Sequence, residues 1–470
     1  MGAVAVEWTG VGPELLIRLD RAGDESLGLQ VQRQVRDAIR AGRLEQGERL
    51  PSSRALAEQL GVSRGVVVDC YAQLESEGYL TSLVGSGTHV AFGVAEARVD
   101  RPPRPPVARL DVDFEYGVPD LGSFPMRDWS WSLGVACRTA SVGDLGDEPG
   151  TGSDHLRRVL AAYVRRVRGS SVDAANVVVC PGFRHGLNIV LRALAVAGVE
   201  RVAMEDPGPI DHDTIALHSG LEAVPVPVDD GGIDVDALAA TSARAVIVTP
   251  AHQCPTGVLL APERRHALIE WARRVDGFVI EDDYDVEFRY DRQPVGSVQG
   301  LAPDRVLAMG SVSKTLAPTL RLGWIACPPD LREAVGREKQ LLGRGAPGID
   351  QLALAALIES GRYDKHLRNM RGIYGRRRRA LVDALAAHAP DVSVSGLAAG
   401  CHAVLCLPAG AEERHVVTQA ARRSVGVYGM SRYRSGRGCD PPELVVGFGN
   451  VTEGAIRRGI GAIADLVQGG

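Results

Sequence analysis

The chain has 470 residues, roughly two to three times the length of a typical domain, so at least two folding units are expected. Its hydrophobic content of 45% and charged content of 24% are those of an ordinary globular protein. The net charge of -5 excludes a general attraction to nucleic acid, so any DNA binding must be local. The absence of a leader pattern and of a bilayer-length apolar run predicts a cytoplasmic protein. Eight cysteines without a C-x-x-C pair predict neither disulfides nor a metal site.

Three helices and a small hairpin are predicted in residues 1–92. Apolar residues recur with helical spacing in three segments that each end at a glycine: 29–42, 51–61 and 63–78. The tight turn between the second and third segments predicts a helix-turn-helix, whose second helix can enter the DNA major groove. Two strands around the Gly85, Ser86 and Gly87 turn predict a wing after the third helix.

The charges of this N-terminal piece do not by themselves favour DNA binding. Its arginines between residues 27 and 92 are matched by an equal number of acidic residues. Arg54, Ser63 and Arg64 nevertheless stand at helix N-termini, where proteins contact phosphates and bases. A helical module used for dimerisation or for protein contacts is the alternative function of this piece.

A linker is predicted between residues 93 and 110, where four prolines alternate with basic residues. In the following part, 111–470, short runs of valine and isoleucine alternate with longer amphipathic segments. This pattern predicts an α/β domain with a mainly parallel sheet. After about residue 362, a basic helix, shorter strands and a final helix over 452–467 predict a smaller C-terminal α+β subdomain.

Polar residues follow four of the predicted strands, at the sheet edge where open parallel sheets bind ligands. These segments are Pro181-Gly182, Thr249 to Gln253, Glu281 to Tyr284, and Ser311 to Lys314. Together they supply an amine, a carboxylate, a phenol and a candidate phosphate cradle. Pyridoxal 5′-phosphate (PLP) requires this set of groups, because a lysine holds it as a Schiff base and an acid keeps its pyridine nitrogen protonated.

Lys314 is the candidate for the Schiff base. It is one of only three lysines in a chain with 53 lysines and arginines. Arginine stays protonated and cannot form an imine, whereas a buried lysine can lose its proton and attack an aldehyde. Ser311, Ser313 and Arg321 flank it at a spacing suited to a phosphate group. An ordinary surface lysine is the alternative, and the polar strand ends favour the cofactor.

Residues 29–92 resemble the winged-helix DNA reader of the GntR family of transcription regulators. The segment "GRLEQGERLPSSRALAEQLGVSRGVVVDCYAQLESEGYLTSLVGSGTHV" is close to the family signature along its whole length. The resemblance implies that the DNA-contacting residues are Arg54, Ser63, Arg64, Gly85, Ser86 and Gly87. Gly65 stands where the family often has a polar residue, which implies one side-chain contact fewer.

Residues 111–468 resemble the class I aminotransferase fold, which is fold type I of the PLP enzymes. The segments "HQCPTG", "IEDDYDVEFRYD" and "SVSKTLAPTLRLGW" carry this resemblance, and the order of the two pieces resembles the MocR subfamily of regulators. The resemblance implies that Lys314 holds PLP, that Asp282 pairs with the pyridine nitrogen and that Tyr284 donates to the 3′ oxygen. The implied phosphate-binding residues are Gly182, Ser311, Ser313 and Arg321. Arg432 is the candidate for binding the carboxylate of an effector, and a solvated arginine is the alternative.

Three positions depart from the pattern of the family. Pro209 stands where relatives have an aromatic residue that stacks on the cofactor ring, and Phe183 is a candidate to replace that ring. The loop "PGFRHGL" places large residues where relatives have small or amide side chains. Cys254 replaces another aromatic residue. These differences concern the lining of the pocket and the effector more than the attachment to Lys314.

The sequence therefore predicts a PLP-dependent transcription regulator that binds double-stranded DNA and senses PLP, an amino compound or both. An active aminotransferase with an accessory DNA-binding domain is the first alternative, and turnover of an amino donor with a keto acid would identify it. A regulator that has lost PLP is the second. The family also implies a homodimer.

Overall fold

The computed structural model describes residues 17–83, 87–91, 110–147, 150–290, 295–343, 345–436 and 441–469. Its contacts divide the chain into two units, residues 1–107 and residues 108–470. The predicted linker lies outside the described residues, apart from Leu110. Within the described part of the chain, no helix combines the length and apolar character that a membrane span needs.

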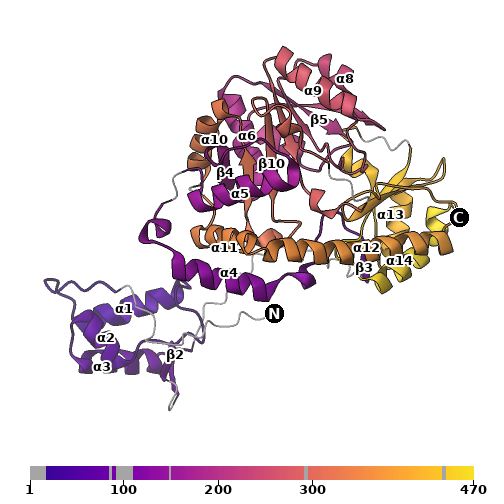
Figure 1. Cartoon of the computed structure of the whole chain (residues 1–470). Helices are drawn as coiled ribbons and strands as arrows, with labels where there is room; N and C mark the ends of the chain where they lie inside the picture. Colours follow the sequence, from indigo (N-terminus) through magenta and orange to yellow (C-terminus); the bar gives the residue numbers. More distant parts are fainter. Residues whose placement is uncertain are drawn as a thin grey trace. The chain divides into compact units, whose positions relative to one another are not determined.

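The N-terminal unit consists of three helices and a hairpin: α1 (Leu27–Arg40), α2 (Ser53–Leu60), α3 (Arg64–Ser76), β1 (Leu80–Leu83) and β2 (Gly87–Val90) (Figure 1). The side chain of Ser52 caps α2 by accepting a hydrogen bond from the Ala55 amide. Gly61 ends this helix in the left-handed conformation, which glycine adopts at no steric cost. The helices and the hairpin enclose one apolar core that includes Leu56, Val67 and Leu74. The predicted helix-turn-helix and wing strands are thus present.

The second unit is built on an eight-stranded sheet of order β4-β11-β10-β9-β8-β5-β6-β7 (Figure 1). Its strands are β4 (Val177–Cys180), β5 (Arg201–Asp206), β6 (Glu222–Asp229), β7 (Gly232–Ile233), β8 (Ala245–Val248), β9 (Phe278–Asp282), β10 (Val306–Ser311) and β11 (Gly323–Ala326). The pairs that join β10, β9, β8, β5 and β6 are parallel. The edge strand β7 and the inserted strand β11 are antiparallel to their neighbours.

Helices cover both faces of this sheet, as its nearly continuous apolar strands require. They are α4 (Met126–Thr139), α5 (Asp154–Arg168), α6 (Phe183–Val196), α7 (His212–His218), α8 (Val235–Ala239), α9 (Pro262–Arg274), α10 (Pro329–Leu342) and α11 (Gly348–Glu359). Successive strand residues alternate between the two faces. Ala245 and Ile247 pack in the core with α6, α7 and α10, whereas Val246 and Val248 pack with α8 and α9.

A smaller subdomain follows the long helix α12 (Arg362–His388). Its elements are β12 (Val394–Ser395), β13 (His402–Cys406), α13 (Glu413–Arg422), β14 (Val425–Gly426), β15 (Tyr428–Gly429), β16 (Glu443–Gly447) and α14 (Glu453–Val467). Four of these strands form a sheet of order β12-β13-β16-β15. The short strand β3 (Val112–Asp113), from the start of the unit, pairs with β14, so the subdomain contains residues from both ends of the second unit.

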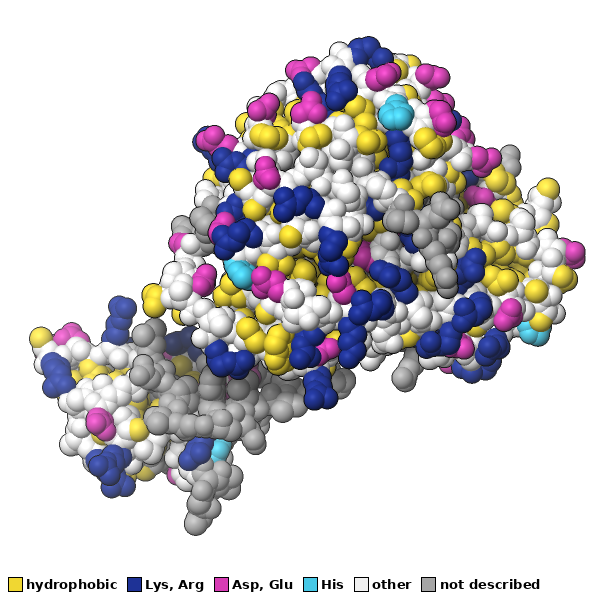
Figure 2. Space-filling view, viewed as in Figure 1, with side chains coloured by type: hydrophobic (Ala, Val, Ile, Leu, Met, Phe, Trp, Pro, Cys, Tyr) yellow, Lys and Arg dark blue, Asp and Glu magenta, His cyan; other side chains and the backbone are white. Residues whose placement is uncertain are grey.

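Helix α12 presents a row of exposed basic side chains (Figure 2). They are Arg368, Arg371, Arg376 and Arg379. A cleft of about 860 Å³ lies between this helix and the segment around Glu287 and Tyr290. Lys314 does not line this cleft, so the basic face of α12 is separate from the candidate site described next.

Candidate functional site

Four strand ends meet at one edge of the large sheet. Strands β8, β9 and β10 are parallel to one another. Strand β11 lies between β10 and β4 and is antiparallel to both, so β4 runs in the same direction as β10. The segments that follow these four strands therefore start at the same edge. They contain Gly182, His252, Tyr284 and Lys314. This arrangement agrees with the expected position of a ligand at the carboxyl ends of the strands.

Lys314 lies in a small pocket at this edge, three residues after β10 ends. The pocket is also lined by Tyr116, Gly117, Tyr284, Cys401 and His402. The ammonium of Lys314 donates a hydrogen bond to the carbonyl of Gly117. Burial lowers the pKa of the amine. A lowered pKa favours the neutral amine, the form that attacks a carbonyl carbon.

Asp282 is the last residue of β9 and is only 6% exposed. Among the described residues, its Oδ1 atom has no hydrogen-bond partner. Burial raises the pKa of this carboxyl well above its usual value, and the neighbouring charges of Asp283 and Asp285 raise it further. An unpartnered buried carboxyl is costly, so this position fits a ligand that brings its own N–H group. The pyridine nitrogen of PLP is such a group.

Gly182 and Arg321 form the opposite end of the candidate site. Gly182 stands before the first residue of α6 and has a φ of 85°, which favours glycine. A Cβ atom at this position would lie 3.3 Å from Nη1 of Arg321. The guanidinium therefore lies beside the N-terminus of an α-helix, and both groups attract anions. Burial lowers the pKa of the adjacent His185 imidazole, and the Arg321 charge contributes.

The predicted serines lie in the turn between β10 and Lys314. The Ser313 amide donates to the Ser311 hydroxyl over 3.4 Å, and both side chains are half-buried. The chain then reaches Arg321, whose φ of 52° is in the left-handed region. This short turn brings two hydroxyls, an amine and a guanidinium close together in the sequence and on the same edge of the sheet.

Phe183, Pro209 and Cys254, which depart from the family pattern, have different surroundings. The ring of Phe183 lies 5.8 Å from the ring of the buried His212, at an angle of 32°. Pro209 is half-buried in the loop that leads to His212. The Cys254 thiol donates to the hydroxyl of Tyr116 over 3.0 Å. The small cysteine side chain is thus in direct contact with an aromatic residue that lines the Lys314 pocket.

Arg432 lies in the short 3-10 helix Met430–Tyr433 and is exposed. Its guanidinium stands 4.7 Å from the centre of the Tyr428 ring, a cation–π distance. The neighbouring Arg434 instead pairs with Glu443 at 3.5 Å. Of these two arginines, Arg432 is the more accessible to a ligand. The amide of Gly208 also donates to the carbonyl of Tyr433, which ties this helix to the loop after β5.

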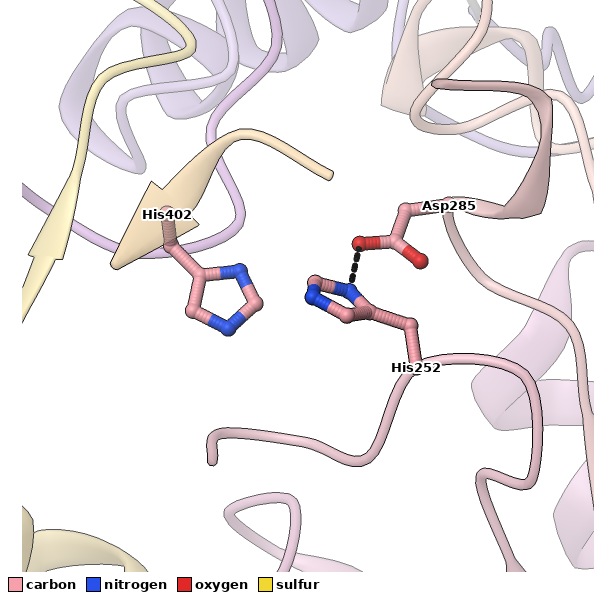
Figure 3. Close-up of side chains that lie close together, drawn as sticks. All are labelled: His252, Asp285 and His402. Carbon is pink, nitrogen blue, oxygen red and sulfur yellow. Dashed lines mark hydrogen bonds and ion pairs between the residues drawn. The ribbon is translucent and has the colours of Figure 1, made fainter. Parts of the chain in front are cut away.

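Sequence analysis did not assign roles to three buried side chains beside the pocket: His252, Asp285 and His402 (Figure 3). Nδ1 of His252 lies 2.8 Å from Oδ2 of Asp285 and 3.1 Å from the hydroxyl of Tyr284. His402 comes from β13 of the smaller subdomain, and its ring centre lies 4.9 Å from that of His252. Gly117, whose carbonyl accepts the hydrogen bond of Lys314, also had no predicted role. The adjacent Tyr116-Gly117 pair is the only local pattern that could have indicated it.

The predicted DNA-contacting residues are placed at the surface of the N-terminal unit. Arg54, Ser63 and Arg64 are exposed at the starts of α2 and α3. The Ser63 side chain makes no capping hydrogen bond, and Arg64 reaches the hydroxyl of Ser53 over 3.3 Å. Gly87 begins β2, and a Cβ atom there would lie 3.0 Å from the Arg49 side chain. Gly85 and Ser86 lie outside the described residues.

Two family matches cover most of the chain. Residues 27–90 match the bacterial regulatory proteins of the gntR family. Residues 146–463 match the family of aminotransferases of class I and II.

Several curated proteins are similar to this chain over almost their whole length. The pyridoxine biosynthesis transcriptional regulator PdxR of Corynebacterium glutamicum is 33% identical, over 97% of this chain and 99% of that protein. The probable rhizopine catabolism regulatory protein MocR of Rhizobium meliloti is 32% identical, over 95% of both chains. The transcriptional regulator TauR of Rhodobacter capsulatus is 31% identical, over 77% of this chain and 80% of that protein.

Among solved structures, the second unit has the fold of aminotransferases. The kynurenine aminotransferase of Pyrococcus horikoshii superimposes with a TM-score of 0.70 and 23% identity, over 77% of this chain and 91% of that chain. An archaeal alanine:glyoxylate aminotransferase gives a TM-score of 0.69 and 24% identity, over 76% and 90% of the two chains. With a gntR-type reader and an aminotransferase-like unit in one chain, and with relatives that share both, the protein belongs to the MocR-type helix-turn-helix transcription regulators of the gntR family.

Proposed function

We propose that this regulator binds PLP in its aminotransferase-like unit and that the bound ligand controls its binding to DNA. One observation carries the proposal: the buried Asp282 carboxyl has an unpartnered oxygen and interacts electrostatically with the Lys314 amine. The Asp282 carboxyl and the Lys314 amine differ, because burying an unpartnered carboxyl oxygen is costly, whereas the amine donates to the Gly117 carbonyl. They are suited to a ligand with an aldehyde and a protonated ring nitrogen.

Each residue of the site would bind a different part of the cofactor. Lys314 would hold its aldehyde carbon, Asp282 its ring nitrogen and Tyr284 its 3′ oxygen. The phosphate would lie against Gly182, Ser311, Ser313 and Arg321, with the Phe183 ring as a candidate lining group. PLP supplies an aldehyde that reacts with amines and a ring that withdraws electrons. The chain supplies binding groups, and we infer little or no turnover because the similar full-length proteins are regulators.

The effector is PLP itself, an amino compound that reacts with it, or both. The name of the Corynebacterium relative refers to pyridoxine biosynthesis, and that of the Rhizobium relative to rhizopine catabolism. PLP is therefore the first ligand to test, and amino compounds with a carboxylate are the second, because the exposed Arg432 guanidinium could bind a carboxylate.

We further propose that the protein acts as a cytoplasmic homodimer on a pair of DNA half-sites. The proposed reader ends near residue 92, and the proposed effector domain begins near residue 111.

Lys314→Arg is expected to abolish covalent attachment of PLP while keeping the positive charge. Arginine cannot form an imine, so borohydride should fix the cofactor on the wild-type chain and not on the variant. The measurement is the visible absorption spectrum of the full-length protein with PLP, followed by mass analysis of borohydride-treated peptides.

Lys365→Arg is the matched control, because Lys365 is an exposed lysine on α12. It should keep the wild-type spectrum and the modified Lys314 peptide. Modification of Lys365 or Lys339 in the wild type, with none on Lys314, would contradict the assignment. A wild-type protein that binds no PLP would overturn the proposed function.

Arg64→Ala is expected to weaken specific DNA binding by about 1–3 kcal/mol, roughly five- to 150-fold. Arg64 is exposed at the first residue of the proposed recognition helix, and no described carboxylate lies within ion-pair distance of it. Arg33→Ala is the control, since Arg33 on α1 already pairs with Glu25 at 2.8 Å. Gel-shift titration at constant salt, with the promoter region of the protein's own gene, measures both. Equal losses in the two variants would argue against recognition by the N-terminus of α3.

A further inference from the structure

His252 has oxygen atoms near both of its ring nitrogens, and Figure 3 shows the contact with Asp285. Its Nδ1 atom lies 2.8 Å from Asp285 Oδ2 and 3.1 Å from the hydroxyl of Tyr284. Its Nε2 atom lies 3.3 Å from the carbonyl oxygen of Gly396. The side chains of His252 and Asp285 are 2% and 6% exposed. A charge on either one is therefore compensated by the protein and not by water.

The group formed by His252, Asp285 and His402 has the composition of a metal site, but its distances are those of hydrogen bonds. Two ligands on a tetrahedral zinc ion are about 3.3 Å apart, because each stands about 2 Å from the metal. The His252–Asp285 contact of 2.8 Å is shorter than this separation. The possible ligand atoms of the three residues all lie within 4.8 Å of one another. The cluster is therefore interpreted as a hydrogen-bonded group.

The partners of His252 determine where its protons lie. The Gly396 carbonyl can only accept a hydrogen bond, so Nε2 must carry a proton to bind it. A hydrogen bond from Nδ1 to an Asp285 carboxylate, which can only accept, requires a second proton on the ring. The ring is then a positively charged imidazolium, paired with the carboxylate. His402 differs, because burial, and then the charge of His252, lower the pKa of its imidazole to about 3.

Two glycines bring backbone close to this pair, Gly400 just before β13 of the smaller subdomain and Gly257 in the loop after β8. Gly400 has a φ of 71°, and a Cβ atom there would overlap Asp285 Oδ2 and lie 3.0 Å from His252 Nδ1. Gly257, with a φ of 74°, would place a Cβ atom 3.0 Å from His252 Nε2. A larger side chain at either position would overlap this group, so the two glycines allow the backbone to approach the His252 ring closely.

We propose that Asp285 keeps His252 doubly protonated, and that this directs the single hydroxyl hydrogen of Tyr284 toward the bound ligand. If Nδ1 lacked its proton, the Tyr284 hydroxyl would donate its hydrogen to Nδ1. That hydrogen would then not be available to a second acceptor. With Nδ1 protonated, the phenol oxygen can only accept from His252, and its hydrogen goes to another acceptor, which in the protein without ligand is the Tyr116 hydroxyl. His252 and Asp285 are thus positioning residues for Tyr284. This inference rests on the proposed function, in which Tyr284 donates to the 3′ oxygen of PLP.

Other titratable groups face this pair. They are Tyr284 from the segment after β9, His402 from β13, Cys254 from the loop after β8, Tyr116 from the segment after β3, Lys314 from the turn after β10, Cys401 next to β13 and Asp282 from β9. The His402 Nε2 atom lies 2.9 Å from the carbonyl of Pro255, so it donates there and leaves Nδ1 as an acceptor. Burial raises the pKa of the Cys254 thiol and of both phenols, so these three groups stay neutral near pH 7. Among the described residues, Asp285 is the carboxyl group within hydrogen-bond distance of His252.

The test is a pH titration of the visible absorption of PLP bound to the full-length protein. A hydrogen-bond donor to the 3′ oxygen of PLP stabilises the negative charge of that oxygen. The visible absorption spectrum of bound PLP therefore changes at a lower pH when the donor is present. Tyr284→Phe should raise that pH by about one unit, the effect of one charge-assisted hydrogen bond. Asp285→Asn should give a shift of the same sign and similar size. The double variant should shift no further than Tyr284→Phe alone, because both changes remove the same hydrogen bond.

His252→Asn is the second variant, for the case in which Asp285→Asn fails to fold or to bind PLP, and it should reproduce the same shift. Glu359→Gln is the matched control, because Glu359 and His155 form an exposed histidine–carboxylate pair at 3.0 Å. It should titrate like the wild type. A shift in Tyr284→Phe with none in Asp285→Asn or His252→Asn would overturn this inference and leave the proposed function standing. Absence of PLP binding by the wild type would overturn both.

Discussion

Asp282→Asn is expected to stabilise the ligand-free protein and to weaken its binding of PLP. The carboxyl of Asp282 is buried with an unpartnered oxygen, and burial raises its pKa well above the unfolded value. A raised carboxyl pKa means that the folded protein holds the proton more tightly. The contribution of Asp282 to stability is therefore greatest below the unfolded pKa and is lost as the pH rises through the folded pKa. At pH 7 the asparagine, which has no charge to bury, should recover about 1–3 kcal/mol.

The same substitution removes the acid that would keep the ring nitrogen of PLP protonated. The dissociation constant for PLP should rise roughly tenfold to a hundredfold, the value of one hydrogen bond to a charged group. Thermal unfolding at pH 5 and pH 8 without ligand, and titration with PLP, measure the two effects. The stability difference between variant and wild type should be larger at pH 8.

Asp283→Asn is the matched control for the change at Asp282, with the opposite expected sign. Asp283 binds the buried Arg168 through both carboxylate oxygens, at 2.8 and 2.9 Å. Its loss should destabilise the protein by about 3–5 kcal/mol, because Arg168 would lose its main partner. Equal destabilisation by the two substitutions would show that the Asp282 carboxyl is a structural group without a ligand of its own.

Leu74→Ala is expected to destabilise the N-terminal unit by about 2–5 kcal/mol and to abolish DNA binding, with no change in the PLP spectrum. Leu74 is completely buried in the single core of this small unit, where it packs among residues such as Leu56 and Val67. A unit of this size has only about 4–10 kcal/mol of stability in total. The cavity left by the leucine side chain therefore removes a large part of it.

Differential scanning calorimetry of the full-length protein, with gel-shift titration and PLP absorption on the same samples, measures this effect. Val68→Ala is the control for stability, because Val68 lies on the same helix and is 44% exposed. It should leave the unfolding temperature almost unchanged. Loss of PLP absorption in Leu74→Ala would contradict the assignment of the PLP site to residues 111–470.

Local patterns predicted most of the helices and strands of this protein, because short-range sequence controls them. Helical spacing and terminal glycines marked α2 and α3, and the valine-rich runs marked strands such as β4 and β8. The antiparallel insertion of β11 between β4 and β10 was not predicted. Strand direction depends on long-range pairing, and the run Gly323–Ala326 contains no information about its neighbours.

The candidate site also contains residues that the sequence predicted and residues that only the structure showed. By itself, the sequence determined the residues at or just after the strand ends, Asp282 and Lys314 among them, because parallel strands carry their ligand-binding residues at one end. Only the tertiary structure brought His252, Asp285 and His402 together, from segments up to 150 residues apart. It alone placed the Gly117 carbonyl at the Lys314 amine. The physical reason is that burial and hydrogen-bond partners depend on how distant segments pack, and no local spacing encodes that packing.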